Sequence, residues 1–288
     1  MKILVTESQY RKILGEEKEQ KMFRVPGLDF FHEYPWKAWQ ILQKVLKHRG
    51  YPPYSIGGDL YLDSTPIKSL GNLQSVGGDL DLRRTAIESL GNLQSVSGDL
   101  FLTATPIETL GNLKSVGGVL DLRGALIESL GNLESVTHNV SLENTQIKSL
   151  GNLTSVGGYL DLEGTPIQSL GNLESVGEDL WLEGSLIESL GNLISVGDTL
   201  NLKRTPIKSL GNLTSVGKSV YLGGTKIKSL GNLEYVGRSL DVQKTSIDSL
   251  GKLQYVGGDL NLYGTPLSDK FSYTEIKEVV NVMGAIFM

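Results

Sequence analysis

The sequence repeats itself every 20 residues from about Tyr54 to Pro266, without an insertion. The copy from Gly71 to Leu90 has the sequence GNLQSVGGDLDLRRTAIESL, and the next copy is GNLQSVSGDLFLTATPIETL. We number each copy from its first glycine, so that Gly71 is at position 1 and Leu90 at position 20. A short, strict period of this kind is typical of solenoids, in which every copy forms one coil of a stack.

Six positions of the copy are almost always aliphatic. In one copy these are Leu73, Val76, Leu80, Leu82, Ile87 and Leu90, at positions 3, 6, 10, 12, 17 and 20. Ordering one residue costs roughly 1–2 kcal/mol of backbone entropy, whereas burying one aliphatic side chain returns only about 1.5–3 kcal/mol. A single copy therefore cannot close a core, and its stability must come from stacking on neighbouring coils.

The segment G-x-L-x-L at positions 8–12 alternates apolar and polar residues, which is the period of a half-buried strand. Stacked copies predict a parallel sheet with positions 10 and 12 inward and positions 9, 11 and 13 on its outer face. We expect Gly77 and Gly78 to supply φ freedom for a tight corner. The return segment S-L-G-N-L is too short for a full helix and is expected to form turns or extended chain.

These strings carry a family resemblance. The pattern LxLxxTxIxxL resembles the leucine-rich-repeat signature, with Thr where that family usually has Asn, and SLGNLxSVGGxLxL is similar to bacterial and viral repeats related to receptor L domains. The resemblance covers about three quarters of the chain in eleven strand-bearing copies. It implies a right-handed, curved solenoid that binds macromolecules through a parallel sheet on its concave side. The opening MKILVTESQYRKIL resembles the starts of tailed-phage open reading frames, which suggests a phage protein.

Two polar columns have structural explanations. Thr occupies position 15 in nine of eleven copies, and its hydroxyl is predicted to bond to the backbone of its own or the adjacent coil. An ice-binding surface is the weaker interpretation, because positions 13 and 17 offer no second Thr column. Asn at position 2 is predicted to bond inward at a turn. The recurring carboxylates Asp79 and Asp81 do not converge on one point, as calcium ligands must.

The outer face of the sheet carries the candidate binding residues. At position 11, aromatic residues alternate with small polar or acidic ones, and like residues would recur roughly every 10 Å. Such a row can stack on sugars or anchor a basic peptide or protein. The alternative is a row of good strand formers on a solvated face. The candidate ligand-binding residues are Tyr61, Asp81, Phe101, Asp121, Tyr159, Asp161, Trp181, Tyr221 and Asp241.

Solenoid ends need caps over their apolar cross-sections. We expect an N-terminal segment at 1–30 with a small strand, a helix and a flexible link, then a helical cap at 31–53. The solenoid follows at 54–267 and a helical C-terminal cap at 268–288. The first cap helix is predicted from Trp36, Trp39, Leu42 and Leu46, which recur at helical spacing. Pro35 and Gly50 lie where this helix is expected to start and stop. Ser272 and Glu275 form a capping-box pattern, and Gly284 is expected to end the second helix.

Composition excludes several function classes. The chain has no cysteine, a net charge of −5 and three scattered histidines, so we expect no enzyme, no cofactor, no metal site and no nucleic-acid partner. The apolar run Ile3 to Val5 is too short for a signal peptide, and no later stretch approaches a membrane span. A cytoplasmic location is expected, with association with a virion as an alternative.

Three functions follow from this sequence. The first is a protein-binding scaffold that uses the concave sheet face. The second is a glycan-binding or adhesive element of a virion or cell surface, and the third is a structural spacer without a ligand.

Overall fold

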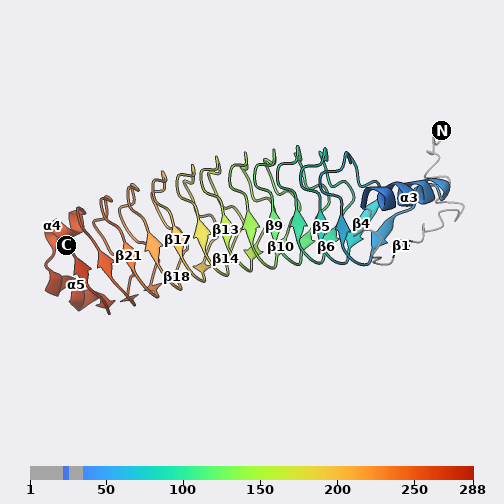
Figure 1. Cartoon of the computed structure of the whole chain (residues 1–288). Coiled ribbons are helices and arrows are strands. Elements are labelled where there is room, and N and C mark those ends of the chain that lie inside the picture. Colours follow the sequence, from blue (N-terminus) through green and yellow to red (C-terminus); the bar gives the residue numbers. More distant parts are fainter. Residues whose placement is uncertain (1–21, 26–34) are drawn as a thin grey trace, which may run out of the picture.

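The structure is a computed structural model that describes residues 22–25 and 35–288. The strand and helix expected before residue 15 lie outside the described residues. Figure 1 shows one elongated stack of coils with helix α3 (Pro35–His48) at one end and helix α5 (Tyr273–Val279) at the other. The predicted repeat solenoid is confirmed, because each 20-residue copy forms one coil of a β-solenoid and consecutive coils pair in parallel and in register, as Leu80 does with Leu60.

Two parallel sheets run along the described part of the stack. Sheet A has 13 strands: β1 (Phe23–Val25), β2 (Tyr54–Ile56), β4 (Leu73–Val76), β6 (Ser95–Val96), β8 (Ser115–Val116), β10 (Ser135–Val136), β12 (Ser155–Val156), β14 (Ser175–Val176), β16 (Ser195–Val196), β18 (Ser215–Val216), β20 (Tyr235–Val236), β22 (Tyr255–Val256) and β24 (Asn281–Val282). Sheet B has 12 strands: β3 (Leu60–Tyr61), β5 (Leu80–Asp81), β7 (Leu100–Phe101), β9 (Leu120–Asp121), β11 (Val140–Ser141), β13 (Leu160–Asp161), β15 (Leu180–Trp181), β17 (Leu200–Asn201), β19 (Val220–Tyr221), β21 (Leu240–Asp241), β23 (Leu260–Asn261) and β25 (Ile286–Phe287).

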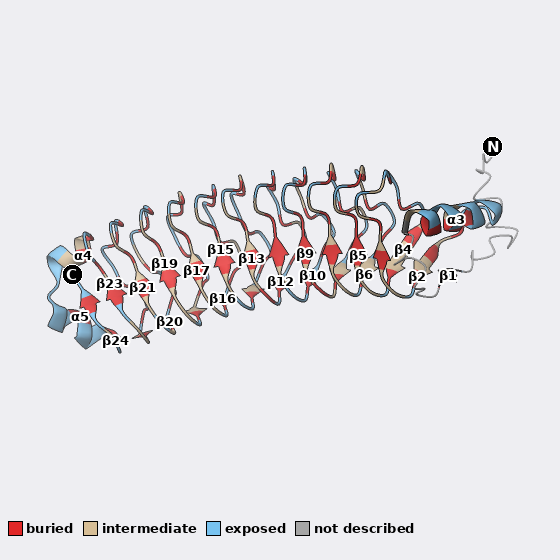
Figure 2. Cartoon of the chain, in the orientation of Figure 1, coloured by how far each residue is buried: buried red, intermediate tan, exposed pale blue. Residues whose placement is uncertain are grey.

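Sheet B is the predicted sheet, although its strands are limited to positions 10 and 11. Sheet A, at positions 5 and 6, was not predicted. The return segment forms the expected turn at Gly71 and Asn72. Between the sheets lies a continuous column of buried aliphatic side chains, and Figure 2 shows how burial follows the strands from one end of the stack to the other. Leu80, Leu82 and Ile87 are among those with no exposed surface, which confirms the inward direction of positions 10, 12 and 17.

The glycines before sheet B serve close packing, so the expectation of φ freedom at Gly77 and Gly78 was wrong. Neither residue has a positive φ. A Cβ at Gly77 would instead lie 2.6 Å from the carbonyl oxygen of Gly57 in the preceding coil. The left-handed backbone occurs at position 1, where Gly71 has a φ of 59°, and at position 14, where Arg84 has a φ of 56°.

The threonine column has the predicted structural role. Thr165 Oγ1 donates to the Leu162 carbonyl at 2.7 Å, and seven other threonines of the column make the same bond. The hydroxyls of Ser185 and Thr225 are buried without a partner.

The asparagine column differs from the inward bonding that we predicted, because its side chains lie at the surface and bridge to the preceding coil. Nδ2 of Asn132 donates to the Gly111 carbonyl at 3.1 Å, and Asn172 and Asn232 repeat this bond. Where coils lie closer, the backbone makes the link instead, as from the Lys252 amide to the Gly231 carbonyl. Lysine is therefore tolerated at residue 252, because the bond there needs no amide side chain.

Helix α3 (Pro35–His48) forms between Pro35 and Gly50 as predicted, and Trp39, Leu42 and Leu46 join the buried column. The segment expected to be a flexible link contains β1, which pairs with β2 and extends sheet A. Helix α3 has 14 residues, and none of the described helices offers an apolar span of bilayer length.

The C-terminal segment is more than a helical cap. Helix α4 (Pro266–Lys270) is followed by α5 (Tyr273–Val279), which begins at the predicted capping box of Ser272 and Glu275. Helix α5 is capped by Val280, so the expectation that Gly284 ends it was wrong. Strands β24 and β25 then extend sheets A and B by one further coil.

Candidate functional site

The outer face of sheet B consists of the side chains at positions 9, 11 and 13. Position 11 forms one unbroken row, because each residue pairs in register with the same position of the next coil, as Asp161 does with Trp181. All predicted site residues lie in this row except Tyr159, which is at position 9. The row places distant members several coils apart, so these residues form a surface and not one pocket. Neighbouring coils bring together one set made of Tyr61, Asp81, Phe101 and Asp121, and a second set made of Tyr159, Asp161 and Trp181.

Several predicted acidic residues bond to their own strand end. Asp81 Oδ1 accepts from the Arg83 amide at 3.0 Å, and the same bond recurs at Asp121, Asp161 and Asp241. A carboxylate that accepts the amide two residues later forms an Asx turn, which stabilises the corner after the strand. Sequence reasoning missed this role, although Asp or Asn at position 11, just before the corner, was its signal.

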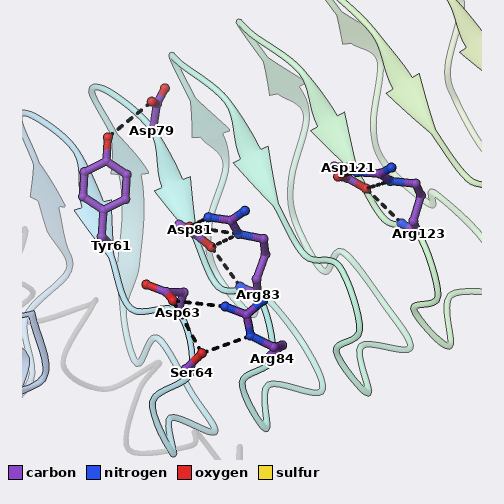
Figure 3. Close-up of polar contacts among 9 residues, drawn as sticks. All are labelled: Tyr61, Asp63, Ser64, Asp79, Asp81, Arg83, Arg84, Asp121 and Arg123. Carbon is purple, nitrogen blue, oxygen red and sulfur yellow. Dashed lines mark hydrogen bonds and ion pairs between the residues drawn. The ribbon is translucent and has the colours of Figure 1, made fainter.

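Asp81 and Asp121 are also neutralised by arginine. Arg83 donates to both oxygens of Asp81, at 3.0 and 2.5 Å, and Arg123 holds Asp121 in the same way (Figure 3). Burial would raise the pKa of Asp121, but the hydrogen bonds and charge of Arg123 lower it overall. Both carboxylates are buried, so their bonding capacity is largely used within the chain.

The aspartates at position 9 bond to the next coil. Asp79 Oδ1 accepts from the Asp99 amide at 2.8 Å, and Asp59, Asp99 and Asp179 make the same bond. Glycine at position 8 makes room for this carboxylate, because a Cβ at Gly78 would come within 3.0 Å of the Asp59 Cγ. These bonds explain the recurring G-D string, and no group of ligands suited to a metal ion occurs among the described residues.

Three of the aromatic residues are engaged by polar neighbours. The Arg83 guanidinium lies 5.2 Å from the ring centre of Phe101, and the Lys203 ammonium lies 4.6 Å from that of Tyr221. The Tyr61 hydroxyl bonds to Asp59 at 3.2 Å and to Asp79 at 3.5 Å, the second bond being drawn in Figure 3. Burial, together with these two negative charges, raises the pKa of Tyr61 to about 12. Cations already cover Phe101 and Tyr221, which reduces the aromatic surface that they offer.

The centre of the row differs from its ends. The rings of Tyr159 and Trp181 stack with centroids 5.7 Å apart and 12° between their planes. The Tyr159 hydroxyl lies 3.2 Å from Ser141 Oγ, which fixes the far edge of the ring. Both rings remain partly exposed. No cation–π contact covers either ring within the described residues, in contrast to Phe101 and Tyr221.

Carboxylates that form no ion pair with a described residue occupy the same face of this coil and the preceding one. Glu143, Asp161 and Glu163 form no ion pair with any described residue, whereas Glu183 pairs with Arg204. Burial raises the pKa of Asp161, and the charge of Glu143 adds to the effect. The pKa of Glu163 is also raised, first by burial and then by the neighbouring carboxylates. The charge of Arg123 offsets part of the pKa shift of Asp161, and the charge of Arg204 offsets part of that of Glu163. We call Tyr159, Trp181, Glu143, Asp161 and Glu163 the central site.

The central site combines a flat aromatic surface with carboxylates that form no ion pair with a described residue. An arginine or lysine side chain suits both features, because its cation can lie on the indole and pair with a carboxylate. A comparison of the chain with protein-family models, curated proteins and solved structures finds no match.

Proposed function

We propose that this protein is a non-enzymatic binding scaffold of the leucine-rich-repeat type, which holds a protein partner on the outer face of sheet B. The central site is the anchor, and a basic side chain of the partner docks on Trp181. The observation that carries the proposal is the Tyr159–Trp181 stack beside carboxylates that form no ion pair with a described residue.

The rest of the face supports this choice of anchor. Asp81 and Asp121 are already paired with arginines, and Phe101 and Tyr221 already contact cations. Binding energy at protein interfaces is concentrated in a few aromatic and charged residues, so one such cluster suffices. The surrounding row would then contribute shape and solvent exclusion.

The test compares two matched variants with the native chain in affinity capture from cell lysate, followed by titration of the captured partner. Trp181→Ala removes the proposed anchor, whereas Phe101→Ala removes an aromatic residue of the same row that a cation already covers. We expect Trp181→Ala to weaken binding by about tenfold or more, because loss of an interface anchor costs about 2 kcal/mol. Phe101→Ala should bind within a few fold of the native chain.

Two outcomes would replace this proposal. A polysaccharide that is retained in place of a protein, with the same dependence on Trp181, would make the chain a glycan-binding element. A native chain that retains no partner, or one that binds equally well without Trp181, would favour a structural spacer.

A further inference from the structure

The charge of the solenoid changes sign abruptly along its axis. The stretch from 149 to 202 contains acidic residues and no lysine or arginine: Asp161, Glu163, Glu174, Glu178, Asp179, Glu183, Glu188 and Asp198. The next stretch, from 203 to 233, contains basic residues and no carboxylate side chain: Lys203, Arg204, Lys208, Lys218, Lys226 and Lys228. A rod with adjacent acidic and basic segments is electrostatically complementary to a copy of itself that runs in the opposite direction.

One column shows this complementarity residue by residue. Position 8, which lies between sheets A and B, is occupied in four consecutive coils by Glu178, Asp198, Lys218 and Arg238. Their backbones are hydrogen-bonded in series, from Asp198 to Glu178 at 3.0 Å, from Lys218 to Asp198 at 2.8 Å and from Arg238 to Lys218 at 2.8 Å. Neighbouring coils are about 4.8 Å apart, so the four charges form a straight row. Along the row the charges are negative, negative, positive and positive. A second copy of the row that runs in the opposite direction therefore places an opposite charge against each of them.

The pairing within the row is incomplete. At its centre, Lys218 Nζ lies 2.5 Å from Asp198 Oδ2. At its ends, Glu178 and Arg238 are exposed, and neither forms an ion pair with another described residue. The two end charges are three coils apart and cannot reach each other within one chain.

Small side chains and one aspartate flank the row. Glycine occupies position 7 in all four coils, at Gly177, Gly197, Gly217 and Gly237, and position 9 holds Asp179, Thr199, Ser219 and Ser239. One large side chain projects beside the basic end. Tyr235 is 44% exposed and stacks on Tyr255 with centroids 5.1 Å apart. It lies close to the row, because a Cβ at Gly237 would be 3.4 Å from its Cε1.

We propose that the position 8 row is a docking surface for a second copy of this chain. The two rods lie antiparallel, with a two-fold axis in the interface plane that passes between Asp198 and Lys218. Glu178 of each copy then faces Arg238 of the other. The Asp198–Lys218 pairs of the two copies lie side by side. The same axis places Tyr235 over Ser175 and Gly177 of the second copy, which are small enough to receive its ring. A parallel arrangement would instead oppose like charges.

The test measures the mass of the full chain by analytical ultracentrifugation at low and high salt, with charge-reversed variants. The native chain should dimerise, and its dissociation constant should rise about tenfold or more between 0.05 and 0.5 M salt, because exposed charges are screened. Glu178→Arg and Arg238→Glu should each be monomeric, since each variant opposes like charges at both ends. The double variant should dimerise again.

Mixing the two single variants gives a sharper result. A heterodimer of Glu178→Arg with Arg238→Glu has an opposite-charge pair at both ends, so the mixture should contain dimers that neither variant forms alone. Glu188→Arg is the matched control, because it reverses an exposed charge of the same acidic coil at another corner and should leave the dimer intact. Circular dichroism checks that all variants melt as the native chain does.

The proposal is overturned if the native chain is monomeric at every concentration and salt tested. It is also overturned if a native dimer persists in both single variants, or if the mixture of variants stays monomeric. These results do not depend on the residues of the central site, none of which is changed in these variants.

Discussion

Trp181 stacks on Tyr159 although the two residues occupy different positions of consecutive coils, position 11 in one and position 9 in the other. This diagonal contact depends on the aromatic residues that occupy these two positions, and it occurs beside carboxylates that form no ion pair with a described residue.

The stack should contribute measurably to stability. We expect Tyr159→Ala to lower the free energy of unfolding by about 0.5–1.5 kcal/mol, which is the range for a stacked aromatic pair. Tyr263→Ala is the control, because Tyr263 is 58% exposed and forms no ring stack among the described residues. Urea titration followed by circular dichroism measures both. An equal loss in the two variants would mean that the stack adds nothing beyond ordinary surface contact.

Replacing an aspartate of this row by asparagine should have opposite effects on the free energy of unfolding at Asp121 and at Asp161. The pKa of Asp121 is lowered overall by Arg123, so its ionised form stabilises the fold at neutral pH, and this stability is lost as the pH falls below the usual value of 3.8. Burial raises the pKa of Asp161, so its ionised form costs stability above that raised pKa and costs nothing in acid.

We therefore expect Asp121→Asn to lower the free energy of unfolding by about 1–3 kcal/mol at pH 7. Asp161→Asn should be neutral or slightly stabilising at pH 7, since an amide oxygen can still accept from the Glu163 amide. Unfolding measured from pH 3 to pH 7 checks both, and the two differences from the native chain should shrink toward pH 3. The same sign for both variants at pH 7 would contradict the assignment.

The threonine column allows a paired test of one hydroxyl bond. Thr165→Val removes a buried hydroxyl that donates at 2.7 Å, and it should cost about 0.5–1.5 kcal/mol. Thr225→Val removes a buried hydroxyl without a partner and should be neutral or stabilising. Thermal unfolding of the two variants measures the difference. If Thr225→Val is as destabilising as Thr165→Val, the hydroxyl of Thr225 has a partner in solution.

Two glycines with left-handed backbone should differ in their tolerance of a side chain. Gly151 has a φ of 60°, and a Cβ there would clash with the backbone of Gly131. Gly164 has a φ of 66° with nothing within 4 Å of its Cβ position. We expect Gly164→Ala to cost about 1 kcal/mol from its φ alone and Gly151→Ala to cost more. Equal melting temperatures for the two variants would show that coil contact at position 1 does not matter.

The sequence predicted the coil and the direction of its side chains, because the aliphatic residues at positions 10, 12 and 17 have the same spacing in every copy. It did not predict sheet A, since a strand as short as Ser95–Val96 contains a single inward residue and no alternation. The last coil was missed because two helices interrupt the period. Its signal was present, since Val282 and Ile286 have the same spacing as Val256 and Leu260.

The candidate site was predicted only in outline. The pattern predicted that position 11 faces outward, but it does not distinguish Asp81, which pairs with Arg83, from Asp161, which forms no ion pair with a described residue. That difference depends on contacts between positions 11 and 13. The stack of Tyr159 on Trp181 was equally absent from the pattern, because it joins unlike positions of two copies.

Because similar coils stack in register, the number of copies sets the length of this molecule. Each coil advances the stack by about 4.8 Å, so the 12 strands of sheet B hold the two ends of the rod roughly 5 nm apart. Duplication or loss of one 20-residue copy would change that separation by a single fixed step without altering any remaining coil. Length can thus be adjusted in discrete units while the chemistry at each end is preserved.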